Sequence, residues 1–175
     1  KYFHMNLDNY IRDIADFPKK GIIFKDITPL LNNRDSFNYT LEKFKERLID
    51  KKIDQVVGIE SRGFILGAPL ANMLNCGFVP IRKKGKLPYD VITETYDLEY
   101  GKDTLEIHKD ALIENSNVVL IDDVLATGGT VNASLKLLNA LNVNVLECQF
   151  LIEIKKLNGA NKVLSLDKSY YSMLK

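Results

Sequence analysis

The sequence contains no tryptophan, only two cysteines and only five prolines among its 175 residues. Cys76 and Cys148 stand among apolar residues, and neither belongs to a CxxC pair or to a histidine-containing zinc motif. We therefore expect two buried thiols. Apolar residues make up 46% of the chain, and glycine and proline are too few for a collagen-like or low-complexity protein, so the composition is that of an ordinary globular protein.

Neither sign of charge dominates, because 24 Lys and Arg oppose 23 Asp and Glu, for a net charge of +1. Such a chain has no long-range field to hold a nucleic acid or an anionic membrane, so any bound anion must be held by local groups. Apolar runs such as VVLI at 118–121 are far shorter than the ~20 residues that a membrane helix needs. We expect no nucleic-acid partner, no membrane contact and a cytoplasmic location.

The length suits one domain, since domains usually have roughly 100–200 residues. The four residues KYFH precede Met5 and any amphipathic pattern, and we expect them to be left over from cloning. Residues 5–175 are then a single domain.

Apolar spacing predicts an alternation of helices and strands along most of the chain. Helices are predicted at 7–14, 35–48, 62–76 (ended by Gly77) and 131–142, and strands at 55–59, 78–82, 118–122 and 143–154. This alternation favours an α/β fold, with a mostly parallel sheet flanked by helices. Residues 17–31 fit an extended loop or short strand, and the polar segment 83–103 fits a long mobile flap or a twisted hairpin.

The strongest functional signal is VVLIDDVLATGGT at 118–130. Four apolar strand residues deliver Asp122 and Asp123 to a sheet edge, which is where open α/β sheets bind ligands. The following loop, residues 126–130, precedes a helix, so its backbone N–H groups, its hydroxyls and the helix dipole can surround a phosphate. Gly128 and Gly129 would let the phosphate approach the backbone closely.

Simpler interpretations and other nucleotide motifs fit less well. A lone glycine pair is most often a turn and a lone pair of aspartates most often a solvated strand end, but the joined motif favours a phosphate site. Gly58 and Gly63 have the glycine spacing of a Walker A loop, yet Phe64 stands where that motif requires lysine. An ATPase site is therefore not predicted.

The motif resembles the phosphoribosyl pyrophosphate (PRPP) signature of type I phosphoribosyltransferases, and other segments are similar to the adenine phosphoribosyltransferase family within that group. These segments are FPKKGIIFKDITPLL (17–31), GIESRGFILGAPLA (58–71), FVPIRKKGKLP (78–88), ETYDLEYGKDTLEIHKDAL (94–112) and VLECQFLIEI (145–154). The resemblance covers essentially the whole chain after Met5. It implies the type I fold, a small N-terminal hood at 5–34 over the base site, the flap at 83–103, and a homodimer.

The implied reaction transfers the 5-phosphoribosyl group from Mg²⁺-bound PRPP to N9 of adenine, forming AMP and pyrophosphate in purine salvage. Its transition state resembles a ribosyl cation, so positioning and electrostatics should dominate catalysis. The Mg²⁺ ion would be held mainly by PRPP and pyrophosphate, with no direct protein ligand.

The resemblance also implies residue roles. Asp122 and Asp123 would orient the ribose hydroxyls, Glu99 would handle the ring proton of adenine, and Arg62 would hold pyrophosphate. The implied catalytic residues are Glu99, Arg62, Asp122 and Asp123. The implied PRPP contacts are Ser61, Arg62, Arg82, Lys83, Lys86, Tyr100, Asp122, Asp123, Ala126, Thr127, Gly128, Gly129 and Thr130.

Adenine would lie against Ile23, Phe24 and Lys25. Lys25 and Lys20 depart from the arginine and proline common at these places in the family, which leaves the base contacts open. Without the resemblance, Glu99 is an ordinary exposed loop carboxylate and the lysines are ordinary surface charges. Two alternatives remain: a phosphoribosyltransferase for 6-oxopurines, because the PRPP loop is shared across bases, and a non-catalytic PRPP-binding regulator.

Overall fold

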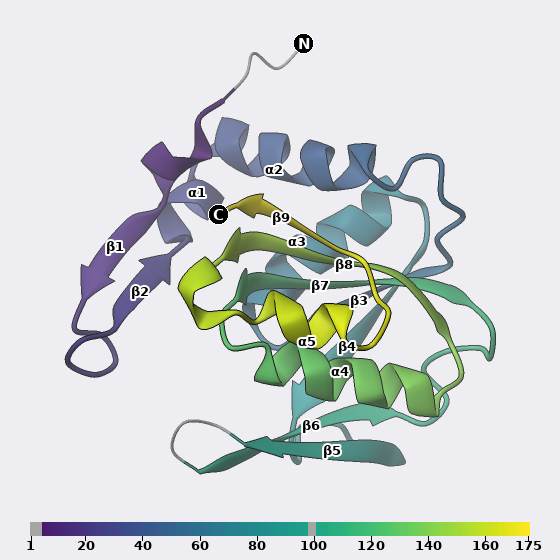
Figure 1. The fold of residues 1–175 in the computed structure, drawn as a ribbon. Coiled ribbons are helices and arrows are strands. Elements are labelled where there is room, and N and C mark those ends of the chain that lie inside the picture. The colour runs from purple at the N-terminus through teal and green to yellow at the C-terminus, as the bar shows by residue number, and fades with distance from the viewer. Residues whose placement is uncertain (1–4, 98–100) are drawn as a thin grey trace.

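The computed structural model describes residues 5–97 and 101–175. In chain order its elements are η1 (Leu7–Tyr10), β1 (Arg12–Ala15), β2 (Ile23–Asp26), α1 (Thr28–Asn32), α2 (Arg34–Glu46), β3 (Gln55–Ile59), α3 (Arg62–Met73), β4 (Gly77–Lys83), β5 (Val91–Asp97), β6 (Lys102–His108), β7 (Asn117–Leu125), α4 (Gly129–Ala140), β8 (Asn144–Glu153), η2 (Lys155–Leu157), α5 (Ala160–Leu164) and β9 (Tyr170–Leu174). The strands form a central sheet with helices on both sides (Figure 1).

Within the described residues, seven strands form the main sheet in the order β5-β6-β4-β3-β7-β8-β9. The strands β4, β3, β7, β8 and β9 pair parallel with their neighbours in this series. Strand β6 pairs antiparallel with both β4 and β5. The predicted mostly parallel sheet is therefore confirmed. The segment 83–103 contains strand β5 and the start of β6, which together form a hairpin at one edge of the sheet.

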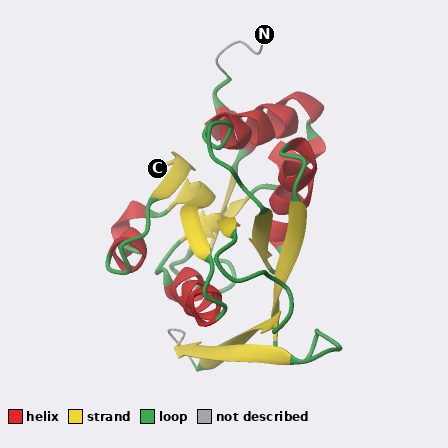
Figure 2. Cartoon of the chain, turned by 90° about the vertical axis from the view of Figure 1, so that its right-hand side faces the viewer, coloured by secondary structure: helices red, strands yellow, loops and turns green. Residues whose placement is uncertain are grey.

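Side chains of the central strand β7 alternate between two hydrophobic clusters, as the period of a strand requires. Val118 and Leu120 belong to one cluster, and Val119 and Ile121 to the other. The first cluster includes residues of α4 and α5, and the second residues of α2 and α3. A view along the sheet shows helices on both of its sides (Figure 2). Because both faces of the sheet are covered, β7 carries apolar side chains on both faces from Val118 to Ile121.

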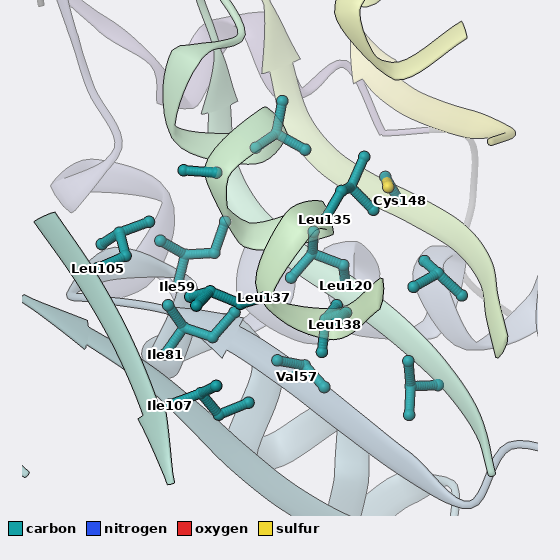
Figure 3. Close-up of a cluster of buried hydrophobic side chains, with 14 of the residues drawn as sticks. Val57, Ile59, Ile81, Leu105, Ile107, Leu120, Leu135, Leu137, Leu138 and Cys148 are labelled. Carbon is teal, nitrogen blue, oxygen red and sulfur yellow. The ribbon is translucent and has the colours of Figure 1, made fainter. Parts of the chain in front are cut away.

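The first cluster packs α4 onto the sheet (Figure 3). Leu135, Leu137 and Leu138 from the helix meet Val57, Ile59 and Leu120 from the strands, and all six are at most 3% exposed. Ile107 joins them from the edge hairpin, so the hairpin is part of the main core along this strand.

On the other face, α3 approaches β3 closely around one aromatic ring. A Cβ on Gly58 or on Gly67 would lie 2.7 or 2.9 Å from Cε2 of Phe78, which is closer than side chains tolerate. The two glycines thus form a slot for this ring. The slot holds the start of α3 close to the end of β3, where we expect phosphate groups to bind.

The N-terminal region differs from its prediction. The predicted helix at 7–14 is wrong: a single 3-10 turn is followed by β1, which pairs antiparallel with β2 and places Ile14 opposite Phe24. Asn6 does cap the turn, since its side chain accepts a hydrogen bond from the Asp8 amide at 3.1 Å. Pairing with a strand ten residues further along overrides the local helical spacing.

Smaller differences occur elsewhere. Helix α3 ends at Met73, and Asn75 rather than Gly77 takes the left-handed conformation, with φ of 54°. Helix α1, helix α5 and strand β9 had no counterpart in the prediction. Cys148 is buried as expected, whereas Cys76 is only half-buried, and both are free thiols. Among the described residues, no helix is both long and apolar enough to cross a bilayer.

Candidate active site

A cavity of about 580 Å³ opens at the carboxyl ends of the parallel strands, the edge at which α/β sheets usually bind ligands. Its walls come from the β1–β2 hairpin, the start of α3, the end of β4, the hairpin β5–β6, the end of β7 and the segment after β8. The lining residues are Ile22, Ile23, Phe24, Lys25, Glu60, Ser61, Arg62, Lys83, Lys86, Tyr96, Leu105, Asp122, Asp123, Val124, Ala126, Thr130, Ile154 and Leu157.

The two aspartates lie inside β7, which continues to Leu125 instead of ending at Asp122 as predicted. Asp123 is 3% exposed, and Asp122 is half-buried. Burial raises the pKa of both carboxyls, and the neighbouring charge of Asp123 raises the pKa of Asp122 further. The pair therefore carries charge that the fold does not fully compensate.

Arg62, the first residue of α3, is the cation nearest this pair. Its Nε lies 2.6 Å from Oδ2 of Asp123, and this attraction opposes the effect of burial on the pKa of Asp123. The guanidinium also lies over the Phe24 ring, 5.0 Å from its centroid. A Cβ on Gly63 would lie 2.8 Å from the carbonyl oxygen of Ile121, so only glycine lets α3 begin this close to β7.

The loop at 126–130 forms a second, smaller cavity of about 60 Å³, lined by Ala126, Thr127, Gly128, Gly129 and Thr130 and their neighbours. Gly128 has φ of 79° and directly precedes α4, whose positive end faces the loop. Small size, free amides and a helix N-terminus are what a phosphate group requires. The geometry of this loop fits the predicted phosphate site, which remains a prediction.

The edge hairpin reaches this loop through Tyr96. The Thr130 hydroxyl donates a hydrogen bond to Oη of Tyr96 at 3.3 Å, and Oη in turn donates to Asp103 at 3.3 Å. Burial raises the pKa of Tyr96, so the phenol stays neutral. A Cβ on Gly129 would lie 3.3 Å from Cδ2 of this ring. The hairpin therefore covers one side of the phosphate loop.

A buried carboxylate, Glu60, organises the basic residues of the site. Its side chain is 8% exposed and accepts hydrogen bonds from Nε of Arg82 at 3.3 Å, from the backbone amide of Lys83 at 2.9 Å and from Nζ of Lys86. Burial alone would raise its pKa, but the Lys86, Lys83 and Arg82 groups outweigh burial and lower it. Lys83 itself pairs with Asp103 at 2.5 Å.

The opposite end of the cavity is more apolar. Ile23 and Phe24 of β2 line it together with Ile154 and Leu157. Lys25 also lines the cavity, and its ammonium group is held 2.7 Å from Asp13, its cross-strand neighbour on β1. A flat aromatic base fits between such walls better than a charged group does.

Most predicted residues therefore surround one space. Arg82 does not line it but contacts two residues that do, Glu60 and Lys86, and Thr127, Gly128 and Gly129 line the adjoining small cavity. Glu99 and Tyr100 lie outside the described residues. Glu60, Tyr96, Asp103 and Leu157 also lie in or beside the site, and none of them was predicted to have a role there. Of these, only Glu60 had a sequence signal, because it directly precedes the predicted Ser61-Arg62 turn.

Comparison with known proteins agrees with this geometry. The phosphoribosyl transferase domain family matches residues 37–174. The adenine phosphoribosyltransferase of Brachyspira hyodysenteriae is 53% identical over 159 residues, covering 91% of this chain and 94% of that protein.

Solved structures are similar over nearly the full length. Adenine phosphoribosyltransferase from Thermoanaerobacter pseudethanolicus gives a TM-score of 0.91 at 49% identity and covers 97% of both chains. The enzyme from Saccharomyces cerevisiae, solved with adenine and an imino-altritol bisphosphate, also gives 0.91, at 40% identity and 96% coverage of both chains.

Proposed function

The chain belongs to the adenine phosphoribosyltransferase family, and from this premise we propose that its cavity transfers the 5-phosphoribosyl group of PRPP to N9 of adenine. The products are AMP and pyrophosphate, and the reaction salvages a free purine base. The observation that supports this most directly is that one cavity joins apolar residues, two aspartates and a basic wall, with the small cavity of the phosphate loop adjoining it.

The two aspartates supply the electrostatic part of the mechanism. Their carboxylates accept hydrogen bonds from the ribose hydroxyls and stabilise positive charge that develops on the ribose ring. Arg62 lies beside Asp123 and holds pyrophosphate through its remaining N–H groups, a geometry that suits a guanidinium. Since burial raises the pKa of both aspartates, ribose binding also provides the hydrogen bonds that favour their ionised form.

The phosphate loop and the basic wall fix the two ends of PRPP. Residues 126–130 hold the 5-phosphate through backbone amides and hydroxyls. Ser61, Lys83 and Lys86 line the cavity beside Arg62 and contact the pyrophosphate end. Holding both ends leaves the ribose carbon between them at a defined distance from the base.

The base end would take adenine between Phe24 and the apolar residues opposite it. Backbone groups of Ile23 read the edge of the ring. By resemblance to the family, Glu99 handles the ring proton while N9 attacks, and Tyr100 contacts PRPP.

Mg²⁺ is the metal that the family implies, and the donor set of the site fits an ion carried by the substrate. Among residues 5–97 and 101–175, no three His, Cys, Asp or Glu side chains form a metal-binding cluster. Mg²⁺ is commonly held by substrate phosphates with few protein ligands. When bound, it would offset the charge of the departing pyrophosphate, next to the basic wall.

We also propose that the enzyme is a cytoplasmic homodimer, for which the family resemblance is the support. Light scattering at micromolar concentration should give about twice the chain mass of 19.9 kDa. A monomeric mass at full activity would contradict the proposed dimer.

The function is tested by mixing the protein, Mg²⁺ and PRPP separately with adenine, hypoxanthine, guanine, xanthine, uracil and orotate, and measuring pyrophosphate release. We expect useful rates with adenine alone. Equal release with hypoxanthine would indicate a 6-oxopurine enzyme. No release with any base, despite PRPP binding, would indicate a regulator instead.

A further inference from the structure

The segment that follows β8 touches the phosphate loop by bare backbone. Gly159 precedes α5, 31 positions after Gly128, yet a Cβ on Gly128 would lie 2.6 Å from the carbonyl oxygen of Gly159. In the opposite direction, a Cβ on Gly159 would overlap the carbonyl oxygen of Ala126 and lie 2.9 Å from the amide nitrogen of Gly128. Both glycines are therefore needed for this contact.

Backbone conformation does not explain why residue 159 is glycine. Its φ of −61° and ψ of −28° are ordinary helical values that any residue adopts. Gly128 differs, because its φ of 79° is itself a conformation that favours glycine. What position 159 requires is the absence of a side chain, because the three heavy atoms nearest to a Cβ there all belong to the phosphate loop.

The same segment is fixed at its other end and also forms a wall of the large cavity. The Ile154 amide donates a hydrogen bond to the carbonyl oxygen of Leu125 at 2.9 Å, which ties the segment to the end of β7. Ile154 and Leu157 then face the base end of the cavity. Residues 154–159 thus run from the base end to the phosphate loop.

We propose that Gly159 is a positioning residue for the 5-phosphate loop, with its backbone setting where the Ala126 carbonyl and the Gly128 amide lie. This rests on the proposed role of residues 126–130. It is a separate inference, because Gly159 lies outside the 118–130 motif and does not itself line the large cavity. An added methyl group at 159 would push the loop away from α5 and misplace its amides.

The test compares Gly159→Ala with Gly77→Ala, a matched glycine at the start of β4 where a Cβ would lie an ordinary 3.4 Å from Gln55. Binding of ribose 5-phosphate and of Mg²⁺-pyrophosphate is measured separately by calorimetry, together with the KM for PRPP. For Gly159→Ala we expect the KM for PRPP to rise and ribose 5-phosphate binding to weaken, each by about tenfold or more, as small misplacements of binding groups can cause.

Pyrophosphate binding should change less than about twofold, because its contacts lie on α3 and β4. Equal weakening of both ligands would overturn the proposal, since general loss of structure would explain it. Unchanged ribose 5-phosphate binding would overturn it as well. If the wild-type protein released no pyrophosphate with adenine, the proposed function would fail, whereas the ligand comparison would still test the role of Gly159.

A second variant covers the case in which Gly159→Ala does not fold. Asn158 has φ of 54°, so Asn158→Val places a β-branched residue in the left-handed region and shifts Gly159 without adding an atom to the contact. We expect the same selective loss of ribose 5-phosphate binding, by about threefold to fivefold. Loss of pyrophosphate binding to the same extent would contradict the inference.

Discussion

Two groups of buried carboxylates lie on neighbouring strands of the same sheet, and they differ in how well the fold pairs them. Glu147 on β8 is 2% exposed and Asp123 on β7 is 3% exposed. Glu147 accepts two hydrogen bonds from Arg47, at 2.8 and 3.1 Å, and one from Lys51 at 3.2 Å. Asp123 has a single cation beside it, Arg62, whose Nε lies 2.6 Å from Oδ2 without the alignment of a good hydrogen bond.

This difference reverses the direction of the pKa shift. Although burial raises the pKa of Glu147, its hydrogen-bond partners outweigh burial and lower it. For Asp122 and Asp123, burial dominates and the pKa rises. Glu147 and Asp123 are thus equally buried, but the protein pairs the Glu147 carboxylate more completely than it pairs the two aspartates, which are left for a ligand. Polar groups left unsatisfied in the fold are a typical cost of a binding site.

The largest expected effect separates the two groups by substitution. Asp122→Asn should lower kcat/KM by at least about 100-fold, because it removes a charge that stabilises the transition state. It should also raise the free energy of unfolding at pH 7 by about 1 kcal/mol, since it removes like-charge repulsion and an incompletely paired carboxylate. Steady-state assays and urea unfolding measure the two quantities. A variant that loses both activity and stability would contradict the comparison.

Glu147→Gln is the matched control and should give the opposite result. Losing the buried charge leaves Arg47 and Lys51 without their partner, which should lower the free energy of unfolding by about 2 kcal/mol. The loss is no larger because both cations remain partly exposed to water. Activity per folded molecule should stay within about twofold. A loss of activity comparable with that of Asp122→Asn would show that the Glu147 group also acts in the site.

The second prediction concerns a third carboxylate, Glu99, whose proposed role is proton transfer. Glu99→Gln keeps the shape of the side chain and removes its affinity for a proton. We expect kcat to fall by at least about 100-fold, the lower end for a general acid or base, with PRPP binding nearly unchanged. Single-turnover rates measure the effect on the chemical step, and PRPP titration measures the effect on binding. A kinetically silent variant would leave Glu99 as an ordinary flap carboxylate and assign catalysis to electrostatics and positioning.

The third prediction concerns the phosphate loop, which, unlike the carboxylates, is proposed to bind its ligand through uncharged groups. Gly129→Val adds a branched side chain where even a Cβ would lie 3.3 Å from the Tyr96 ring. The hairpin must then move away from the loop, and the new methyl groups also occupy phosphate space. We expect the KM for PRPP to rise about tenfold with a smaller change in kcat. If only kcat fell, the loop would act after binding and not in the PRPP contact.

The aspartate pair and its phosphate loop could be predicted from the sequence, because the residues that form them are close together in the chain. The strand, the two aspartates and the glycine loop lie within 13 consecutive residues, so their chemistry could be recognised together. The partners of Glu147 could not be predicted, since Arg47 is 100 residues away in the chain. Gly159 gave no signal either, because it requires an empty space that exists only in the folded chain. The predicted helix at 7–14 was wrong because its residues pair with β2, a contact that the local helical spacing does not reveal.

The smallest expected effect is in the pH dependence of stability. A carboxyl whose folded pKa is lowered stabilises the protein above its ordinary pKa, and this contribution is lost as the pH falls through the lowered value. The stability difference between the wild type and Glu147→Gln should therefore be full at pH 7 and shrink only below the ordinary value of 4.5.

Asp122 should follow the opposite rule. Because its folded pKa is raised, the folded protein binds the proton more tightly, and stability falls as the pH rises from the ordinary value of 3.8 through the raised one. The advantage of Asp122→Asn should thus begin to disappear on acidification at a higher pH than the Glu147→Gln difference does. Urea unfolding of the three proteins from pH 7 to pH 4 measures this order, with changes of about 1 kcal/mol per shifted pKa unit. Differences that stay constant with pH would mean that neither carboxyl titrates differently on folding, and the contrast between the two groups would then be one of packing and not of charge.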